Sequence, residues 1–376
     1  MSPQTVPPAD PASSARAYAR IRYRLLLIEL ALGLLFLAGV QASGLSACLA
    51  GWWRTLTPSA PLQLFGYLGV FGLAYYLMRL PLHLYGSYAL EHRFGLSRLA
   101  LRGWWVRELK RVAVSGLLSL LALEGLYALL RGLPSSWPLW ATVAWVGFNV
   151  ALARLFPTVL LPIFYKTSPL RQEELVTRLL ALCRRAGLPA LGVFRFDLGK
   201  ETRKANAALA GLGGTRRVLL ADTLIEAFPP EEIEGVLAHE LGHHRYHHIS
   251  LFLSLSAAGS WIAFRMTDAM GQWWAGRLGL DGLADLAGLP ALLLWFSVLS
   301  LLSLPIQHGI SRFFERQADR YAVTMTQSPQ AFAAALRRLG ALNLADPDPP
   351  RWVVWLFYDH PPIAERIEAA AGNHGA

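Results

Sequence analysis

The feature that most constrains this chain is a set of six apolar stretches, each long enough to cross a lipid bilayer. A hydrocarbon core of about 30 Å requires roughly 20 apolar residues in a helix. Because 54% of the residues are hydrophobic and only 16% are charged, such windows are frequent here. We therefore expect a mainly α-helical, multi-span membrane protein with the bilayer as its partner. The stretches are residues 25–42, 62–82, 112–130, 139–161, 249–266 and 289–306.

The distribution of basic residues predicts the orientation of these spans. Four arginines precede the first stretch, at positions 16, 20, 22 and 24, and six basic residues lie between the second and third. Positive charge accumulates in cytoplasmic loops, so both termini and the polar segment 166–247 are expected in the cytoplasm. This topology also explains the net charge of +10 without nucleic acid, which we do not expect as a partner.

Two carboxylates and two cysteines complete the membrane interpretation. Glu29 and Glu124 lie within predicted spans, where a charge is costly in lipid, so each is expected to face a neighbouring helix or a wet cavity. Cys48 and Cys183 are expected on opposite sides of the membrane. Neither a disulfide nor a cysteine metal site is therefore predicted.

The polar segments predict a small cytoplasmic α/β catalytic domain. A helix is expected at 173–186, strands at 192–196 and 217–220, and a turn in the Gly-rich 211–214. Pro229 and Pro230 open a further helix, which we expect to continue unbroken towards the fifth span. The predicted domains are a disordered tail (1–15), a four-span membrane domain (16–165), the catalytic domain (166–248), two further spans (249–308) and the C-terminal part of the catalytic domain (309–376).

The chemistry is predicted from His239-Glu240-Leu241-Gly242-His243, an H-E-x-x-H motif on this helix. Residues four apart share a helical face, so both imidazoles can hold one Zn²⁺. Glu240 then lies beside the metal as a general base for hydrolysis of a peptide bond. A second metal at the nearby His244, His247 and His248 is not expected.

Two downstream segments supply further candidates. Glu315 and Asp319 share a helical face just past the sixth span, so Glu315 is a candidate third ligand and Asp319 a candidate partner for a ligand histidine. The alternative is an exposed helix face with ordinary salt bridges. His360 is either a donor to the oxyanion of the reaction or a simple loop histidine.

Together with the zinc motif, five blocks in order resemble the type I CAAX prenyl protease family of membrane zinc metalloproteases. They are Glu-His-Arg-Phe-Gly-Leu-Ser at 91–97, Pro-Ile-Phe-Tyr-Lys-Thr-Ser-Pro-Leu at 162–170, the strand region 206–224, the 311–319 segment, and His-Pro-Pro with Glu-Arg at 360–366. The blocks span about residues 60–370. Eukaryotic members typically have seven spans, whereas six are counted here.

The resemblance implies one Zn²⁺ per chain, with Glu315 as the third ligand. It also implies that Asp319 is the hydrogen-bond partner of a metal ligand. It implies that His360 and Arg366 line the site and that the helices enclose a water-filled chamber. It also implies that residues 206–210 form an edge strand to which an extended substrate adds. The substrate-binding residues would be Asn206, Ala207 and Ala208.

Substrate and cellular setting follow less directly. The family's eukaryotic members remove three residues from prenylated C-termini, but the Arg-rich composition suggests a bacterium and its inner membrane. We therefore expect an endopeptidase for hydrophobic or membrane-associated peptides, with CAAX-type cleavage as a capacity. The alternatives are a heat-shock-type quality-control protease and a non-catalytic zinc-binding transporter or scaffold. The sequence predicts no oligomeric state.

Overall fold

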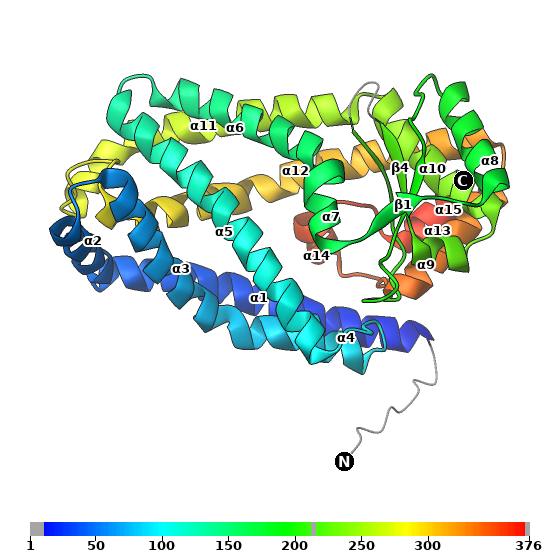
Figure 1. Cartoon of the computed structure of the whole chain (residues 1–376), viewed down its shortest axis with the longest axis horizontal. Coiled ribbons are helices and arrows are strands. Elements are labelled where there is room, and N and C mark those ends of the chain that lie inside the picture. Colours follow the sequence, from blue (N-terminus) through cyan, green and yellow to red (C-terminus); the bar gives the residue numbers. More distant parts are fainter. Residues whose placement is uncertain (1–10, 212–215, 373–376) are drawn as a thin grey trace, which may run out of the picture.

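The computed structural model describes residues 11–211 and 216–372, and it consists mostly of long helices. Six helical segments in this part of the chain are long and apolar enough to span a membrane, so the six predicted spans are confirmed. Figure 1 shows these helices extending from a small mixed unit, which holds the sheet, towards the opposite end of the molecule. The segments are Ala12–Ala42, Ala60–Arg93, Leu101–Gly132, Trp137–Phe164, His248–Arg277 and Leu286–Thr326.

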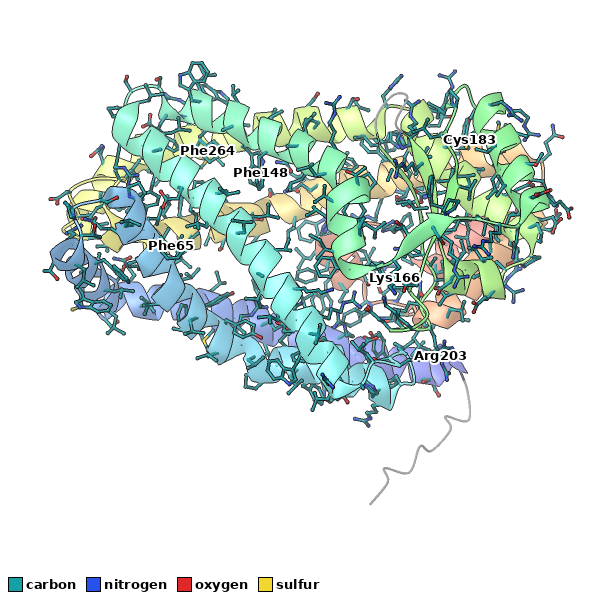
Figure 2. The ribbon with its side chains drawn as sticks, viewed as in Figure 1. Phe65, Phe148, Lys166, Cys183, Arg203 and Phe264 are labelled. Atoms are coloured by element: carbon teal, nitrogen blue, oxygen red, sulfur yellow. The ribbon has the colours of Figure 1, made fainter. Side chains whose placement is uncertain are left out.

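The membrane domain is a set of antiparallel helices that carry apolar side chains on their exposed faces. In Figure 2, Phe65, Phe148 and Phe264 lie on the long helices, whereas Lys166, Cys183 and Arg203 belong to the mixed unit. The helices are α1 (Pro11–Ala42), α2 (Leu45–Leu56), α3 (Ala60–Leu84), α4 (Leu90–Arg93), α5 (Leu101–Gly132), α6 (Trp137–Leu155), α7 (Leu161–Phe164), α11 (His248–Arg277) and α12 (Leu289–Thr326). Short π-helical turns, η1 (Tyr85–Ala89) and η2 (Phe156–Leu160), interrupt the second and fourth spans.

One detail of the membrane domain corrects the sequence predictions, and a second adds to them. Helix α1 begins at Pro11, so residues 11–15 belong to it and not to a tail; residues 1–10 lie outside the described part. The loop after the first span forms α2, whose Ser46 hydroxyl is buried and bonds both Ala287 O (2.6 Å) and the Tyr67 hydroxyl (2.7 Å). These contacts hold α2 against its neighbours, because a buried hydroxyl must be paired.

Glu29, a carboxylate within the first span, forms an ion pair with a neighbouring helix. Its Oε2 lies 2.5 Å from Nη2 of Arg79, which joins α1 to α3. Glu29 therefore faces a neighbouring helix, as predicted, because an ion pair removes much of the cost of a charge in a low-dielectric environment.

The mixed unit contains a four-stranded sheet in the order β1-β2-β4-β3. Strands β2 (Val193–Phe196) and β4 (Arg217–Ala221) are parallel and confirm the two predicted strands, while β1 (Thr167–Pro169) and β3 (Ala207–Ala210) pair antiparallel at the two edges. The predicted turn at 211–214 lies outside the described residues except for Gly211. The helices of the unit are α8 (Glu173–Arg185), α9 (Asp222–Ala227), α10 (Pro230–Arg245), α13 (Pro329–Asn343), α14 (Arg351–Phe357) and α15 (Ile363–Ala370).

A loop of the membrane domain holds the segment that leads into edge strand β3. Leu96 O accepts from the backbone N–H of Arg203 at 3.0 Å and from the Thr202 hydroxyl at 2.9 Å. Lys204 Nζ is 2.9 Å from the Glu91 carboxylate. The block at 91–97 thus positions β3 relative to the membrane helices.

The helix with the metal-binding motif does not continue into the fifth span, contrary to the prediction. Helix α10 ends at Arg245 and α11 begins at His248, and between them His247 adopts a left-handed conformation with φ of 57°. A left-handed residue ends a helix by redirecting the chain. Residues 244–248 contain no Gly or Pro, so no helix-breaking residue indicates this break.

Helices α10 and α12 approach so closely that Gly242 has no room for a side chain. A Cβ there would lie 3.0 Å from Ala318 Cα, which belongs to the backbone of α12. We predict that Gly242→Ala lowers the free energy of unfolding by about 1–3 kcal/mol through overpacking. The check is thermal unfolding in detergent, beside Gly259→Ala, where a Cβ meets open space. Equal midpoints for the two variants would contradict this packing.

Candidate metal centre and substrate cleft

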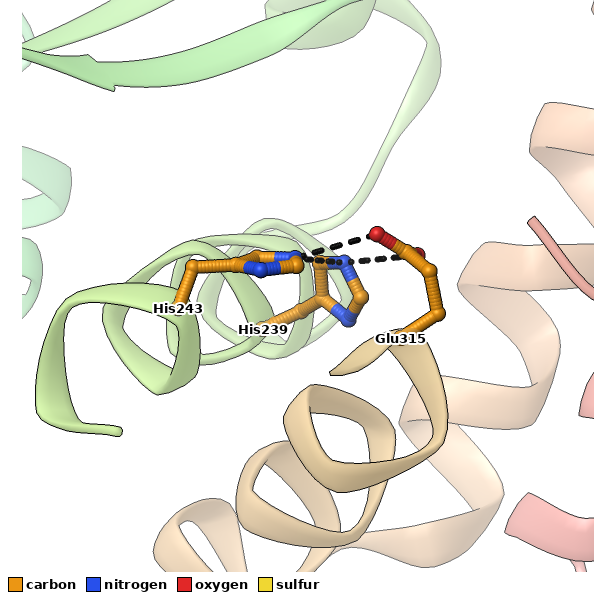
Figure 3. Close-up of side chains that lie close together, drawn as sticks. All are labelled: His239, His243 and Glu315. Atoms are coloured by element: carbon orange, nitrogen blue, oxygen red, sulfur yellow. Dashed lines mark hydrogen bonds and ion pairs between the residues drawn. The ribbon is translucent and has the colours of Figure 1, made fainter. Parts of the chain in front are cut away.

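Three side chains from two helices meet in the mixed unit. His239 and His243 are one turn apart on α10, and Glu315 comes from the adjacent face of α12 (Figure 3). The two Nε2 atoms are 3.2 Å apart. Glu315 places Oε1 at 3.2 Å from Nε2 of His243 and Oε2 at 3.4 Å from Nε2 of His239. The prediction that these three residues converge is confirmed by the geometry.

The three donors fit a divalent metal of tetrahedral preference. Ligand atoms about 2.0–2.1 Å from a tetrahedral Zn²⁺ are separated by about 3.3 Å. The two Nε2 atoms are 3.2 Å apart, and each has one oxygen of the Glu315 carboxylate at 3.2 or 3.4 Å. In the described residues, the buried Oε2 of Glu315 has no hydrogen-bond donor. A buried carboxylate oxygen without a donor is costly unless a cation approaches it, and Arg366 Nη2 lies 3.6 Å away, beyond hydrogen-bond distance. The three residues form a group that is able to hold a metal ion.

The outer nitrogen of His239 is held by a carboxylate and an arginine. Its Nδ1 donates to Asp319 Oδ1 at 2.8 Å, and Arg366 donates to both oxygens of Asp319 at 2.7 and 2.9 Å. Burial disfavours the imidazolium, but the carboxylates of Asp319 and Glu315 outweigh it and raise the pKa of His239 to about 9. The site therefore attracts positive charge strongly, and Nε2 is left as the atom that faces a metal.

The outer nitrogen of His243 is held by residues that the sequence analysis missed. Its Nδ1 lies 3.1 Å from Nδ1 of His248, whose Nε2 lies 2.9 Å from Gln317 Oε1. Since the amide oxygen only accepts, His248 carries its proton on Nε2 and accepts from His243. The His248 ring is buried and stacks on Phe314 at 4.2 Å. Only the break after α10 turns His248 back towards the site.

Glu240 and His360 stand beside the three donors. Desolvation raises the pKa of Glu240 above its usual value, which suits a proton acceptor. His360 places Nε2 at 3.4 Å from Glu315 Oε1, and its Nδ1 bonds Asp359 Oδ1 at 2.8 Å. Burial opposes the charged imidazole, but the bond to Asp359 raises the pKa of His360 overall.

The loop that carries His360 is fixed from two directions. Arg312 of α12 donates to Val354 O at 2.8 Å and to Tyr358 O at 2.6 Å. The Tyr358 hydroxyl is 2.7 Å from the hydroxyl of Tyr23 on α1. The position of His360 therefore depends on contacts with both α1 and α12.

A cavity of about 270 Å³ opens between the metal donors and the edge strand. Its walls join polar groups of the site to an apolar surface. Among the predicted substrate-binding residues, Asn206 and Ala207 line it, whereas Ala208 does not. The predicted edge strand is confirmed, because β3 lies at one end of the sheet order. The apolar part comes from Val236, Phe332, Leu336, Leu339 and Ile363.

Comparison with known proteins agrees with this architecture. A sequence model of peptidase family M48 matches residues 169–373, and one described as "CAAX prenyl protease N-terminal, five membrane helices" matches residues 5–166. In the latter region the described structure has four candidate spans and the short α2.

Individual relatives resemble the chain over most of its length. The uncharacterized metalloprotease YhfN of Bacillus subtilis is 28% identical over 98% of this chain and 89% of its own. The probable CAAX prenyl protease 1 of Schizosaccharomyces pombe is 24% identical over 80% of this chain and 64% of its own. The crystal structure of S. mikatae Ste24p has the same fold, with a TM-score of 0.81, 23% identity and coverage of 98% of this chain and 92% of that one.

The fold and the site define an integral-membrane metalloprotease of the CAAX prenyl protease type. The M48 model spans more than half of the chain, so the protein belongs to peptidase family M48. The predicted resemblance and the predicted hydrolase class are both confirmed. A transporter or scaffold that binds metal only for structure is not supported.

We predict that His248→Ala weakens the affinity of the site for Zn²⁺ by about 10- to 100-fold, because His243 loses the partner that orients its ring. Competition with a chelator in detergent-purified protein measures this affinity. Gln317→Glu keeps an acceptor for His248 and should retain near wild-type affinity, whereas Gln317→Leu should lower it. Unchanged affinity in His248→Ala would show that this chain of hydrogen bonds has no role in holding the metal.

Proposed function

We propose that this protein is a zinc endopeptidase that hydrolyses extended, hydrophobic or membrane-associated peptides. The observation that carries the proposal is the convergence of His239, His243 and Glu315 at 3.2–3.4 Å, beside a cavity with an apolar wall and a free strand edge. One Zn²⁺ per chain would be held by these three residues. Two imidazoles and one carboxylate are a ligand set used by catalytic zinc sites, which leave one position open.

Bound there, Zn²⁺ supplies Lewis-acid polarisation of the substrate carbonyl and of a water molecule. Glu240 would accept a proton from that water as its oxygen attacks the peptide carbon, and would later deliver the proton to the departing amine nitrogen. Desolvation raises the pKa of Glu240 above its usual value, which favours uptake of a proton by this carboxylate. No covalent bond between protein and substrate is needed.

His360 would stabilise the negative charge that develops on the carbonyl oxygen. Its raised pKa favours the protonated ring, whose Nε2–H is a strong donor. Asp359 holds the opposite nitrogen at 2.8 Å and so orients the ring. Arg366 would act indirectly, because it holds Asp319, which in turn orients the ring of His239.

The edge strand would bind the substrate through main-chain groups. Asn206 O accepts from Ala221 N on β4, and hydrogen-bonded pairs alternate along antiparallel strands. The N–H and C=O of Ala207 therefore point to the free edge, whereas those of Asn206 and Ala208 face β4. Ala207 is thus the strongest candidate for pairing with a substrate backbone.

The substrate class follows from the apolar wall and the membrane setting. Aromatic and aliphatic side chains line the cavity, so an apolar substrate residue is favoured beside the scissile bond. Relatives are CAAX prenyl proteases, and cleavage of prenylated C-termini is proposed here as a capacity of this chain. We also propose a bacterial inner-membrane location with the termini and the catalytic unit in the cytoplasm.

The first test is hydrolysis of a farnesylated CAAX peptide and of an unprenylated hydrophobic peptide by detergent-purified protein. Glu240→Gln should reduce turnover by at least about 10²-fold, since it removes the proton acceptor, while keeping about one zinc per chain. The matched control is Glu226→Gln, on a neighbouring helix outside the site. Equal turnover in wild type and Glu240→Gln would rule out the proposed base.

The orientation is tested by labelling single cysteines with a membrane-impermeant maleimide in intact cells. In a background lacking Cys48 and Cys183, Ser135→Cys lies in the loop between α5 and α6, and Lys200→Cys lies before β3. The proposed topology predicts labelling of the first variant in intact cells and of the second only after lysis. The reverse pattern would invert the orientation.

A further inference from the structure

One end of the cleft between α10 and β3 is closed by a contact that plays no part in the metal centre. His244 Nε2 lies 3.2 Å from Leu209 O, and since a carbonyl oxygen only accepts, the ring nitrogen donates. The cavity touches Val236 and Glu240 on the helix and residues 205–207 at the start of the strand, but it reaches neither His244 nor Leu209. The cavity therefore ends before this contact.

His244 lies in the same row of the helix as the proposed base. Val236, Glu240 and His244 are spaced by four residues, so they follow one another along one face of α10. His244 is about 6 Å along the axis from Glu240. Helix and strand thus run beside each other, and the hydrogen bond between His244 and Leu209 lies one helical turn beyond the proposed base Glu240.

The hydrogen bond from His244 also occupies a backbone carbonyl of β3 that a substrate strand would use. Because the pairing of β3 with β4 alternates, the C=O of Leu209 points to the free edge, as that of Ala207 does. His244 takes this acceptor. Within the described strand β3, Ala207–Ala210, the groups left for an added strand are then the N–H and C=O of Ala207 and the N–H of Leu209.

The geometry points to His244 as the residue that limits how far a peptide extends along the cleft on one side of the scissile bond. This inference rests on the proposed function. An extended peptide advances about 3.3 Å per residue, so the distance from Glu240 to His244 accommodates about two residues. Substrates must end, or turn out of the cleft, beyond that length on that side.

Two peptide series with one shared apolar core test the inference. One series is lengthened residue by residue on the N-terminal side of the scissile bond and the other on the C-terminal side, and kcat/KM is measured for each peptide. Wild type should gain nothing beyond about the second residue in one of the two series. His244→Ala should gain about two- to tenfold at the next residue in that series alone, which is the worth of one added main-chain hydrogen bond.

Two further variants distinguish a limit on peptide length from a contact that only holds α10 against β3. His244→Gln keeps an N–H that is able to reach Leu209 O, so it should retain the wild-type length profile. Arg245→Ala changes an exposed neighbour on the same turn and should also behave as wild type. A simple tie between α10 and β3 would instead lower kcat/KM for every peptide by the same factor in His244→Ala.

The possible results are distinguishable from failure of the proposed function. Parallel length profiles in wild type and His244→Ala, with zinc retained and short peptides cleaved by both, would overturn the length limit and leave the peptidase intact. If zinc-loaded wild type cleaves no peptide of either series, the peptidase proposal fails and this inference fails with it.

Discussion

The structure depends on the close approach of α10 and α12, since it brings a glutamate from one helix to two histidines on the other. Gly242 makes the approach possible because no side chain separates it from Ala318. Facing helices hold donors more rigidly than a loop does, and each donor is held in turn: His239 by Asp319 and His243 by His248. Residues that never touch a metal therefore decide the geometry of the site.

The membrane domain and the catalytic unit are mechanically joined at the places that matter for a substrate. The block at 91–97 holds the chain that enters β3, and Tyr23 on the first span contacts Tyr358, two residues before His360. The proposed substrate-binding strand β3 and the proposed oxyanion donor His360 are thus both positioned by contacts with membrane helices. This arrangement suits an enzyme whose substrates arrive from the bilayer, because the cleft has a fixed position relative to the spans.

The sequence predicted what depends on composition and local spacing, and it failed where tertiary contact decides. Six spans, the histidine pair and the helical row of Glu315 and Asp319 follow from hydrophobicity and the helical repeat. The left-handed turn at His247 has no Gly or Pro to signal it, so the prediction of an unbroken helix was wrong. For the same reason the contact of His248 with His243 was not predicted. The contact of His244 with Leu209 joins residues 35 apart in sequence through the sheet, and no local pattern encodes it.

The central claim is that His239, His243 and Glu315 hold one zinc ion. X-ray absorption at the zinc edge on the detergent-purified protein tests it most directly. The account predicts a first shell of nitrogen and oxygen at about 2.0–2.1 Å, with multiple scattering from two imidazoles that falls to one in His243→Ala. A sulfur shell, or an imidazole count that is the same in wild type and His243→Ala, would contradict it.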